Sequence, residues 1–351
     1  MTLRQLLGID WPLIQAPMAG VQGHALAAAV SNAGALGSLP CAMLGPEALR
    51  GELQALKAGT DRPFNLNFFC HSAPQPDAQA EAAWRAALAP YCGELGLDAQ
   101  ASMAGGASRT PFGHAAAEVV EAFKPVVVSF HFGLPPPQLL ARVRATGARI
   151  LSSATTVDEA RCLEAQGVDG VIAQGLEAGG HRGSFLSPDL SLQQGTFALL
   201  PQVVRAVHVP VIAAGGIADA RGVAAALALG AAGVQVGTAY LLCPEATTSA
   251  LHRAALQGEG ARHTALTNLF TGRPARGIVN RLMRELGPMR EGVPAFPLAA
   301  AAIAPLRAAA EARGSSDFTP LWSGQNASGC KPVGAAELTR ELIQAFQDNR
   351  R

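Results

Sequence analysis

The chain has 351 residues, of which 49% are hydrophobic and 15% are charged, and its formal net charge is +1. A chain of this length can bury one large core and a second, smaller unit. The balanced charge, without long runs of like charge, argues against nucleic acid or an anionic membrane surface as a partner.

Cysteine usage and the N-terminus indicate the cellular compartment. The six cysteines lack CxxC spacing and zinc-like pairing with histidine, so we expect reduced thiols and no metal site. No signal peptide is recognisable at the N-terminus, and no unbroken apolar stretch reaches the ~18 residues needed to span a bilayer. We therefore expect a cytoplasmic protein.

Eight short apolar segments have the length and composition of buried strands, and most are followed by helix-like segments. The expected strands are 11–20, 35–40, 63–69, 125–133, 148–155, 170–175, 209–217 and 231–238. The expected helices between them are 24–34, 46–59, 136–147, 157–167, 195–207 and 219–230. Eight alternating units predict an α/β protein with a (β/α)8 TIM barrel of parallel strands. A doubly wound open sheet is the alternative, but it usually carries GxGxxG after its first strand, where this chain has APMAG.

Two regions depart from this repeat. Residues 70–124 are helix-like and irregular, and they are too long for an ordinary barrel loop, so we expect a helical insertion that lids the catalytic face. Residues 245–351 contain helix-like stretches and the loop LWSGQNASG, which predict a C-terminal helical extension and cap, with a part available to complete the barrel. The barrel itself is assigned to 1–69 and 125–244.

The segment EAGGHRG, 177–183, follows the sixth expected strand and places His181 among glycines. Glycines let the backbone approach a ligand closely, and histidine titrates near neutral pH. Barrel enzymes carry their catalytic groups in the loops that follow the strands. His181 is therefore the main candidate for a catalytic base, and His131, at the end of the fourth strand, is a second candidate.

Glycine-bearing turns follow the seventh and eighth strands, as AAGGI (213–217) and QVGT (235–238). Barrels often bind phosphate at this position through backbone N–H groups and a helix N-terminus. Four residues are placed around such a phosphate: Gly215, Gly216, Gly237 and Thr238.

Three further residues suit a planar ligand. Met18 offers a soft, polarisable contact for a ring system at the end of the first strand. Asn67 and Gln174 are amides in otherwise apolar strands, and buried amides need hydrogen-bond partners. A ring edge of alternating donors and acceptors would provide them, although a backbone partner in the core is the alternative for each.

Six segments together resemble the nitronate monooxygenase family, formerly called 2-nitropropane dioxygenases. They are IQAPMAG (14–20), PFNLNFF (63–69), SFHFG (129–133), AQGLEAGGHRG (173–183), PVIAAGGIAD (210–219) and GVQVGTAYL (233–241). The resemblance implies a TIM barrel that contains FMN and no metal. It also implies oxidation of alkyl nitronates by O2 to carbonyl compounds and nitrite, with neutral nitroalkanes as further candidate substrates.

Transferred residue by residue, the resemblance makes His181 the catalytic residue and places His131 near the flavin. The FMN contacts that it implies are Met18, Asn67, Gln174, Gly179, Gly216, Gln235, Val236, Gly237 and Thr238. Well-studied relatives line the substrate pocket with several tyrosines, whereas this chain has only Tyr91 and Tyr240. The preferred nitronate is therefore open.

A histidine beside the flavin can take the acidic C–H proton of a nitroalkane or hold the nitronate anion. One alternative is an FMN-dependent NAD(P)H reductase of quinones or enoyl thioesters. A second alternative is a flavin-free barrel that isomerises or cleaves a sugar phosphate. In each case the expected partner is a small molecule, and the chain is expected to be a monomer or a homodimer.

Overall fold

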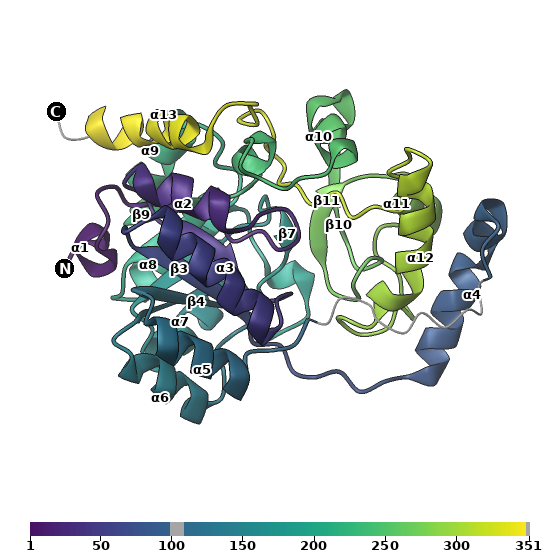
Figure 1. The fold of residues 1–351 in the computed structure, drawn as a ribbon, viewed down its shortest axis with the longest axis horizontal. Helices are drawn as coiled ribbons and strands as arrows, with labels where there is room; N and C mark the ends of the chain where they lie inside the picture. Colours follow the sequence, from purple (N-terminus) through teal and green to yellow (C-terminus); the bar gives the residue numbers. More distant parts are fainter. Residues whose placement is uncertain (99–108, 349–351) are drawn as a thin grey trace.

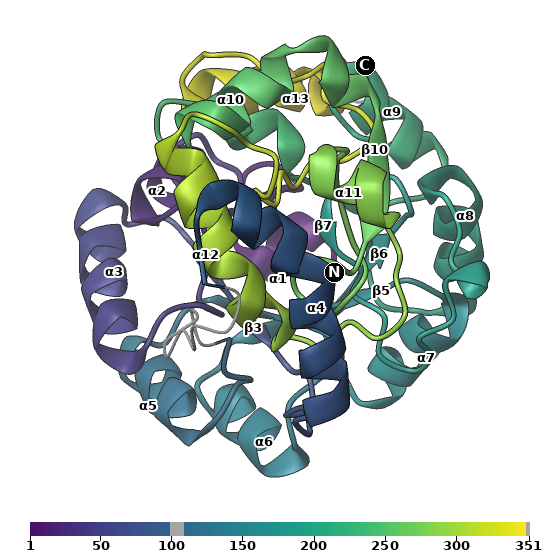
Figure 2. The same ribbon diagram turned by 90° about the vertical axis from the view of Figure 1, so that its right-hand side faces the viewer.

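The computed structural model describes residues 1–98 and 109–348, in which eight parallel strands form a barrel surrounded by helices (Figures 1 and 2). The strand order is β1-β9-β8-β6-β5-β4-β3-β2. A parallel bridge between Ile14 and Leu36 joins β1 to β2 and closes the barrel. The predicted TIM barrel is confirmed. The strands are β1 Leu13–Gln15, β2 Gly37–Pro40, β3 Phe64–Phe69, β4 Val127–His131, β5 Arg149–Ala154, β6 Gly170–Gln174, β8 Val211–Ala214 and β9 Gly233–Val236.

Strand alternation sorts the barrel side chains into two layers. Val171 and Val234 belong to the apolar layer between the strands and the helices. Ile172 and Ile212 point into the barrel and pack in a separate cluster with Leu7 of α1, Leu3–Leu7, which plugs the N-terminal end. Polar side chains at inward-facing positions near the C-terminal ends of the strands therefore point into the opposite, C-terminal mouth of the barrel.

The helical ring includes two helices that lie outside the expected barrel ranges. α5 falls within 70–124, yet it packs between α3 and α6 in the ring, so only the part of this segment before α5 leaves the barrel (Figure 2). α13 packs against α9 and α2 and fills the position after β9 (Figure 2). The ring helices are α2 His24–Asn32, α3 Pro46–Gly59, α5 His114–Phe123, α6 Pro137–Ala145, α7 Val157–Ala165, α8 Thr196–Ala206, α9 Ala220–Ala228 and α13 Ala335–Asp348.

A smaller body, which we call the cap and which comprises α4, α11 and α12, lies beside the barrel (Figure 1). Its helices α4 and α12 pack against each other, and Trp84 Nε1 donates a hydrogen bond to the Ala299 carbonyl at 3.3 Å. A three-stranded sheet, β10-β11-β7, links the cap to the loop that carries His181. The elements outside the barrel strands and the helical ring are α4 Ala78–Leu95, β7 Gly180–His181, α10 Ala250–Gln257, β10 Thr264–Thr267, β11 Ala275–Ile278, α11 Arg281–Leu286 and α12 Ala299–Ala312, with the 3-10 helices Leu190–Leu192, Thr238–Leu242 and Glu259–Arg262.

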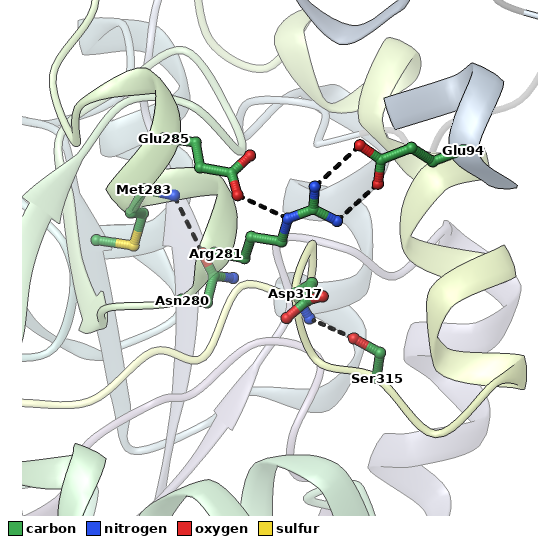
Figure 3. A network of polar contacts seen from close by, with 7 residues as sticks. All are labelled: Glu94, Asn280, Arg281, Met283, Glu285, Ser315 and Asp317. Carbon is green, nitrogen blue, oxygen red and sulfur yellow. Dashed lines mark hydrogen bonds and ion pairs between the residues drawn. The ribbon is translucent and has the colours of Figure 1, made fainter. Parts of the chain in front are cut away.

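An arginine joins α4 to α11 across the cap (Figure 3). The Arg281 guanidinium donates to both Glu94 carboxylate oxygens, at 2.8 and 3.0 Å, and to Glu285 at 2.8 Å. Asn280 caps the helix by accepting a hydrogen bond from the Met283 N–H. These side chains are exposed to solvent, which screens their attraction, so such pairs contribute little to stability. The apolar cluster around Trp84 therefore contributes more to holding α4 in place.

None of the helices in the described part of the chain has the length and apolar character needed to cross a bilayer.

Candidate functional site

One cavity opens at the C-terminal mouth of the barrel, against the cap. The side chain of Val236 lies away from it, in the layer between β9 and the ring helices, as strand alternation requires. Only the Val236 backbone lies toward the first strand, where its carbonyl accepts a hydrogen bond from the Ala16 N–H at 2.8 Å. The other predicted residues all line the cavity: Met18, Asn67, His131, Gln174, Gly179, His181, Gly215, Gly216, Gln235, Gly237 and Thr238.

His181 reaches the cavity from β7, where it pairs with Ala275 of β11. Its Nε2 lies 2.9 Å from Thr271 Oγ1, and among the described residues Nδ1 has no hydrogen-bond partner. Burial lowers the pKa of His181 well below 6.5, and the positive charge of Arg109 lowers it further. The ring is therefore neutral at neutral pH, with one nitrogen available to a ligand.

The backbone carbonyl of His181 is held from two sides. Gln174 Nε2 donates to it at 3.0 Å, and His131 Nε2 lies 3.2 Å from it. Because a carbonyl oxygen can only accept, His131 carries its proton on Nε2, and its Nδ1 accepts from the Ser153 hydroxyl. Burial lowers the pKa of His131 to about 3, so the neutral ring is favoured. His131 and Gln174 are thus placed to position His181 rather than to exchange protons with a ligand.

The glycines of this loop permit close packing that a side chain would block. A Cβ at Gly179 would lie 2.5 Å from the Gly324 nitrogen, and one at Gly183 would lie 2.8 Å from His131 Cε1. Gly180 has a φ of +70°, in the left-handed region that favours glycine. The run of glycines therefore brings the His181 loop against both the fourth strand and the C-terminal segment.

Arg182 links the same loop to the end of β6, a role that the sequence did not reveal. Its side chain is fully buried and donates to the carbonyls of Gly175 and Gln174, each at 2.7 Å, and to Gln193 Oε1 at 2.6 Å. These bonds satisfy carbonyls at the end of β6, where the ladder stops. The only signal in the sequence was an arginine in a glycine-rich segment.

The turns after β8 and β9 form the other end of the cavity. Gly215 and Gly216 have φ values of +118° and +74°, which only glycine adopts readily. Thr238 Oγ1 accepts a hydrogen bond from the Gly324 N–H at 2.9 Å, which leaves the hydroxyl proton free to donate. Asn326 Nδ2 donates to the Gly216 carbonyl at 3.1 Å. The loop LWSGQNASG thus lies against the two turns predicted to hold a phosphate.

One orphaned polar atom indicates that a ligand with a hydrogen-bond donor belongs between these ends. Gln235 Oε1 is buried and has no partner among the described residues. Asn67 donates from Nδ2 to Ser129 Oγ at 2.9 Å, and its side chain lines the cavity. Leaving a buried acceptor unpaired costs about 1–3 kcal/mol. A planar ligand with N–H and C=O groups along one edge, and a phosphate at its other end, fits this cavity.

The chain's two tyrosines are not cavity residues. Tyr91 packs against Phe318 in the cap, with 5.3 Å between ring centres, and the Tyr240 hydroxyl lies 2.9 Å from Thr339 Oγ1 behind the barrel. The aromatic residues that do line the cavity are Phe69, Phe130 and Trp322. A cation that sequence reasoning missed, Arg109, lines it as well.

Comparison with known proteins agrees with this architecture over nearly the whole chain. The sequence model named nitronate monooxygenase matches residues 1–345. The chain is 44% identical to a nitronate monooxygenase of Paraburkholderia phytofirmans, over 99% of this chain and 96% of the relative. It is 43% identical to a nitronate monooxygenase of Pseudomonas aeruginosa, over 98% of each.

Solved structures agree. A nitroalkane oxidase from Streptomyces ansochromogenes superposes with a TM-score of 0.87 at 39% identity and covers 99% of both chains. FabK from Thermotoga maritima is less similar, with a TM-score of 0.74 at 27% identity, over 100% of this chain and 97% of that one. The extent and identity of these matches show that the chain belongs to the nitronate monooxygenase family, whose members are flavoprotein oxidoreductases.

Proposed function

We propose that this protein binds FMN in the cavity and oxidises alkyl nitronates with O2, giving a carbonyl compound and nitrite. The observation that carries the proposal is the convergence of a neutral histidine, an orphaned amide oxygen and two glycine turns on one cavity. The names of the relatives support it, because two are nitronate monooxygenases and a structural neighbour is a nitroalkane oxidase.

The residues at the two ends of the cavity fit the two ends of FMN. The glycine turns after β8 and β9, with the Thr238 hydroxyl, would hold the phosphate. Met18, Asn67 and Gln235 would contact the ring system, whose N–H groups give Gln235 Oε1 the donor it lacks. When bound, FMN supplies the redox chemistry by accepting electrons from the substrate and passing them to O2.

The electrostatics around His181 favour a substrate that is already an anion. With its low pKa, the imidazole is a weak base, and protonation at Nδ1 would create a cation near Arg109 and Arg273. A nitronate needs no proton removed, and its charge is attracted to the same groups. Neutral nitroalkanes are therefore the poorer substrates in this proposal, because His181 would have to take their C–H proton.

The wall beside His181 is aromatic, which excludes water from the reacting group. The rings of Phe296 and Trp322 lie 5.2 and 5.4 Å from the imidazole, centre to centre, and Phe69 lies 6.4 Å away. When the Thr271 hydroxyl donates to Nε2, the neutral ring carries its proton on Nδ1 and can donate it to an anion. A dry wall strengthens that hydrogen bond and limits hydrolytic side reactions.

Spectroscopy tests the proposal. The purified protein should show flavin absorbance, and released cofactor should be FMN by chromatography. Anaerobic addition of propyl-2-nitronate should bleach the flavin bands, and admitting air should restore them with release of nitrite and acetone. A colourless protein that binds no added FMN would contradict the cofactor assignment. Rapid bleaching by NADH, without bleaching by the nitronate, would instead favour the reductase alternative.

A further inference from the structure

Arg109 places a positive charge in the cavity wall on the side of His181. The residue lines the cavity, and its guanidinium carbon lies 6.0 Å from the ring centre of Phe296. That ring lies 5.2 Å from the ring of His181. Arg109 and His181 therefore line the same cavity and lie near the same ring, that of Phe296.

The charge of Arg109 has no acidic partner among the described residues. No ion pair joins its guanidinium to a carboxylate in that part of the chain, and the charged neighbour that influences its pKa is another cation, Arg307. Burial also lowers the pKa of Arg109, but arginine stays protonated in proteins. A partly desolvated cation without a counter-ion is costly, and an anionic ligand relieves that cost.

The other arginines around the site differ in this respect. Glu177 favours the charged forms of Arg182 and Arg276, and Glu159 favours that of Arg273. Each of these three guanidinium groups also donates to backbone carbonyls. The fold therefore accounts for Arg182 and Arg276. Arg273 is held by the Ser184 carbonyl and by the Phe132 ring, 4.0 Å from its guanidinium carbon, although its Nε has no hydrogen-bond partner among the described residues.

The carboxylate that lines the cavity is occupied elsewhere. Glu177 accepts hydrogen bonds from the Thr196 N–H at 2.7 Å and the Thr196 hydroxyl at 2.8 Å, at the start of α8. Thr196 also lies next to Gly215, at the phosphate end. This carboxylate is therefore held by α8 and leaves Arg109 available to a ligand.

We propose that Arg109 and His181 form an anion subsite that holds the two oxygens of the substrate's nitronate group. The assignment rests on the proposed function. A nitronate carries its charge on a planar pair of oxygens, and a guanidinium matches such a pair with two parallel N–H groups. A neutral nitroalkane has oxygens in a similar arrangement but no net charge. Arg109 is thus a specificity-determining residue that selects the nitronate over the neutral nitroalkane.

Nitrate, a planar and redox-inert oxyanion, is the probe for this subsite. Its binding to the flavin-loaded protein is measured by calorimetry for wild type, Arg109→Gln and Arg109→Lys. Arg62→Gln is the matched control, because Arg62 pairs with Asp10 ahead of β3, at the far end of the strands. Flavin content and circular dichroism establish that each variant is folded.

We expect Arg109→Gln to weaken nitrate binding roughly 10- to 100-fold, Arg109→Lys to retain part of it, and Arg62→Gln to match wild type. The kcat/KM ratio of nitronate to neutral nitroalkane should fall with nitrate affinity. Unchanged affinity in Arg109→Gln, or no binding by wild type, would overturn the subsite. Arg109-dependent nitrate binding by a protein that does not oxidise nitronates would support the subsite while refuting the proposed function.

Discussion

Acid should destabilise this protein through its buried histidines, and His252 allows the effect to be measured one residue at a time. His252 lies on α10 and is only 3% exposed. Its Nε2 lies 3.1 Å from the Trp322 carbonyl, to which it must donate. Burial lowers the pKa of His252 to about 4. The residue thus supports a tryptophan of the cavity wall, and does so as a neutral ring.

The depressed pKa fixes the sign and the size of the effect. The unfolded chain, with a histidine pKa of about 6.5, binds more protons than the folded protein at every pH between about 6.5 and 4. The stabilisation is therefore complete above pH 6.5 and is lost as the pH falls toward 4. Each pH unit in this window corresponds to about 1.4 kcal/mol, so acidification from pH 7 to pH 5 costs about 2 kcal/mol at His252.

Urea unfolding at pH 7 and pH 5 provides the assay, with wild type compared with His252→Gln. Glutamine keeps a donor for the Trp322 carbonyl but does not titrate, so the loss of unfolding free energy between the two pH values should shrink by about 2 kcal/mol. His263→Gln is the control, because His263 is exposed and only its backbone makes hydrogen bonds within the described part of the chain, and it should keep the wild-type loss. An equal loss in wild type and His252→Gln would refute the reasoning.

Three substitutions test the site. His181→Asn should retain its flavin spectrum but lose at least ~100-fold in turnover of neutral nitroalkanes, since asparagine cannot take the proton; near-wild-type turnover would remove His181 from that step. Gly179→Ala should lower the flavin-to-protein ratio after purification, because its Cβ would lie 2.5 Å from the Gly324 nitrogen, whereas Gly45→Ala, with open space around it, should not; equal ratios would contradict the packing argument. Gln174→Leu should lower the free energy of unfolding by about 1–3 kcal/mol and reduce kcat, because two hydrogen bonds to the His181 loop are lost; unchanged values of both would show that the loop does not depend on them.

The barrel was predictable because each of its strands is a short apolar run that ends in glycine, proline or a polar residue. The helices that complete the ring around the barrel were not predictable from the sequence. α13 begins at Ala335, after the whole cap has been traversed, and nothing local marks it as the helix that follows β9. α5 has an apolar face like many other helices, and only packing between α3 and α6 assigns it to the ring.

The cavity-lining residues in the glycine-rich turns could be predicted from the sequence. Several glycines close together usually mean that the backbone approaches a ligand or another segment closely. Contacts between residues that are far apart in the sequence were not predictable. Gln174 and His131 were expected at the flavin and both line the cavity, but the sequence did not reveal that both also contact the backbone carbonyl of His181. The sequence does not distinguish Arg109 from Arg182. In the structure, Arg109 lines the cavity without an acidic partner among the described residues, as an anion site requires. Arg182 is buried and donates to backbone carbonyls, as a structural support does.

The most direct test of the account is the anaerobic reaction of the purified protein with propyl-2-nitronate, followed in the visible spectrum. The account predicts a yellow protein whose flavin bands bleach on mixing, recover with air and yield nitrite. A colourless protein, or a flavin that the nitronate leaves oxidised while NADH bleaches it, would contradict the account.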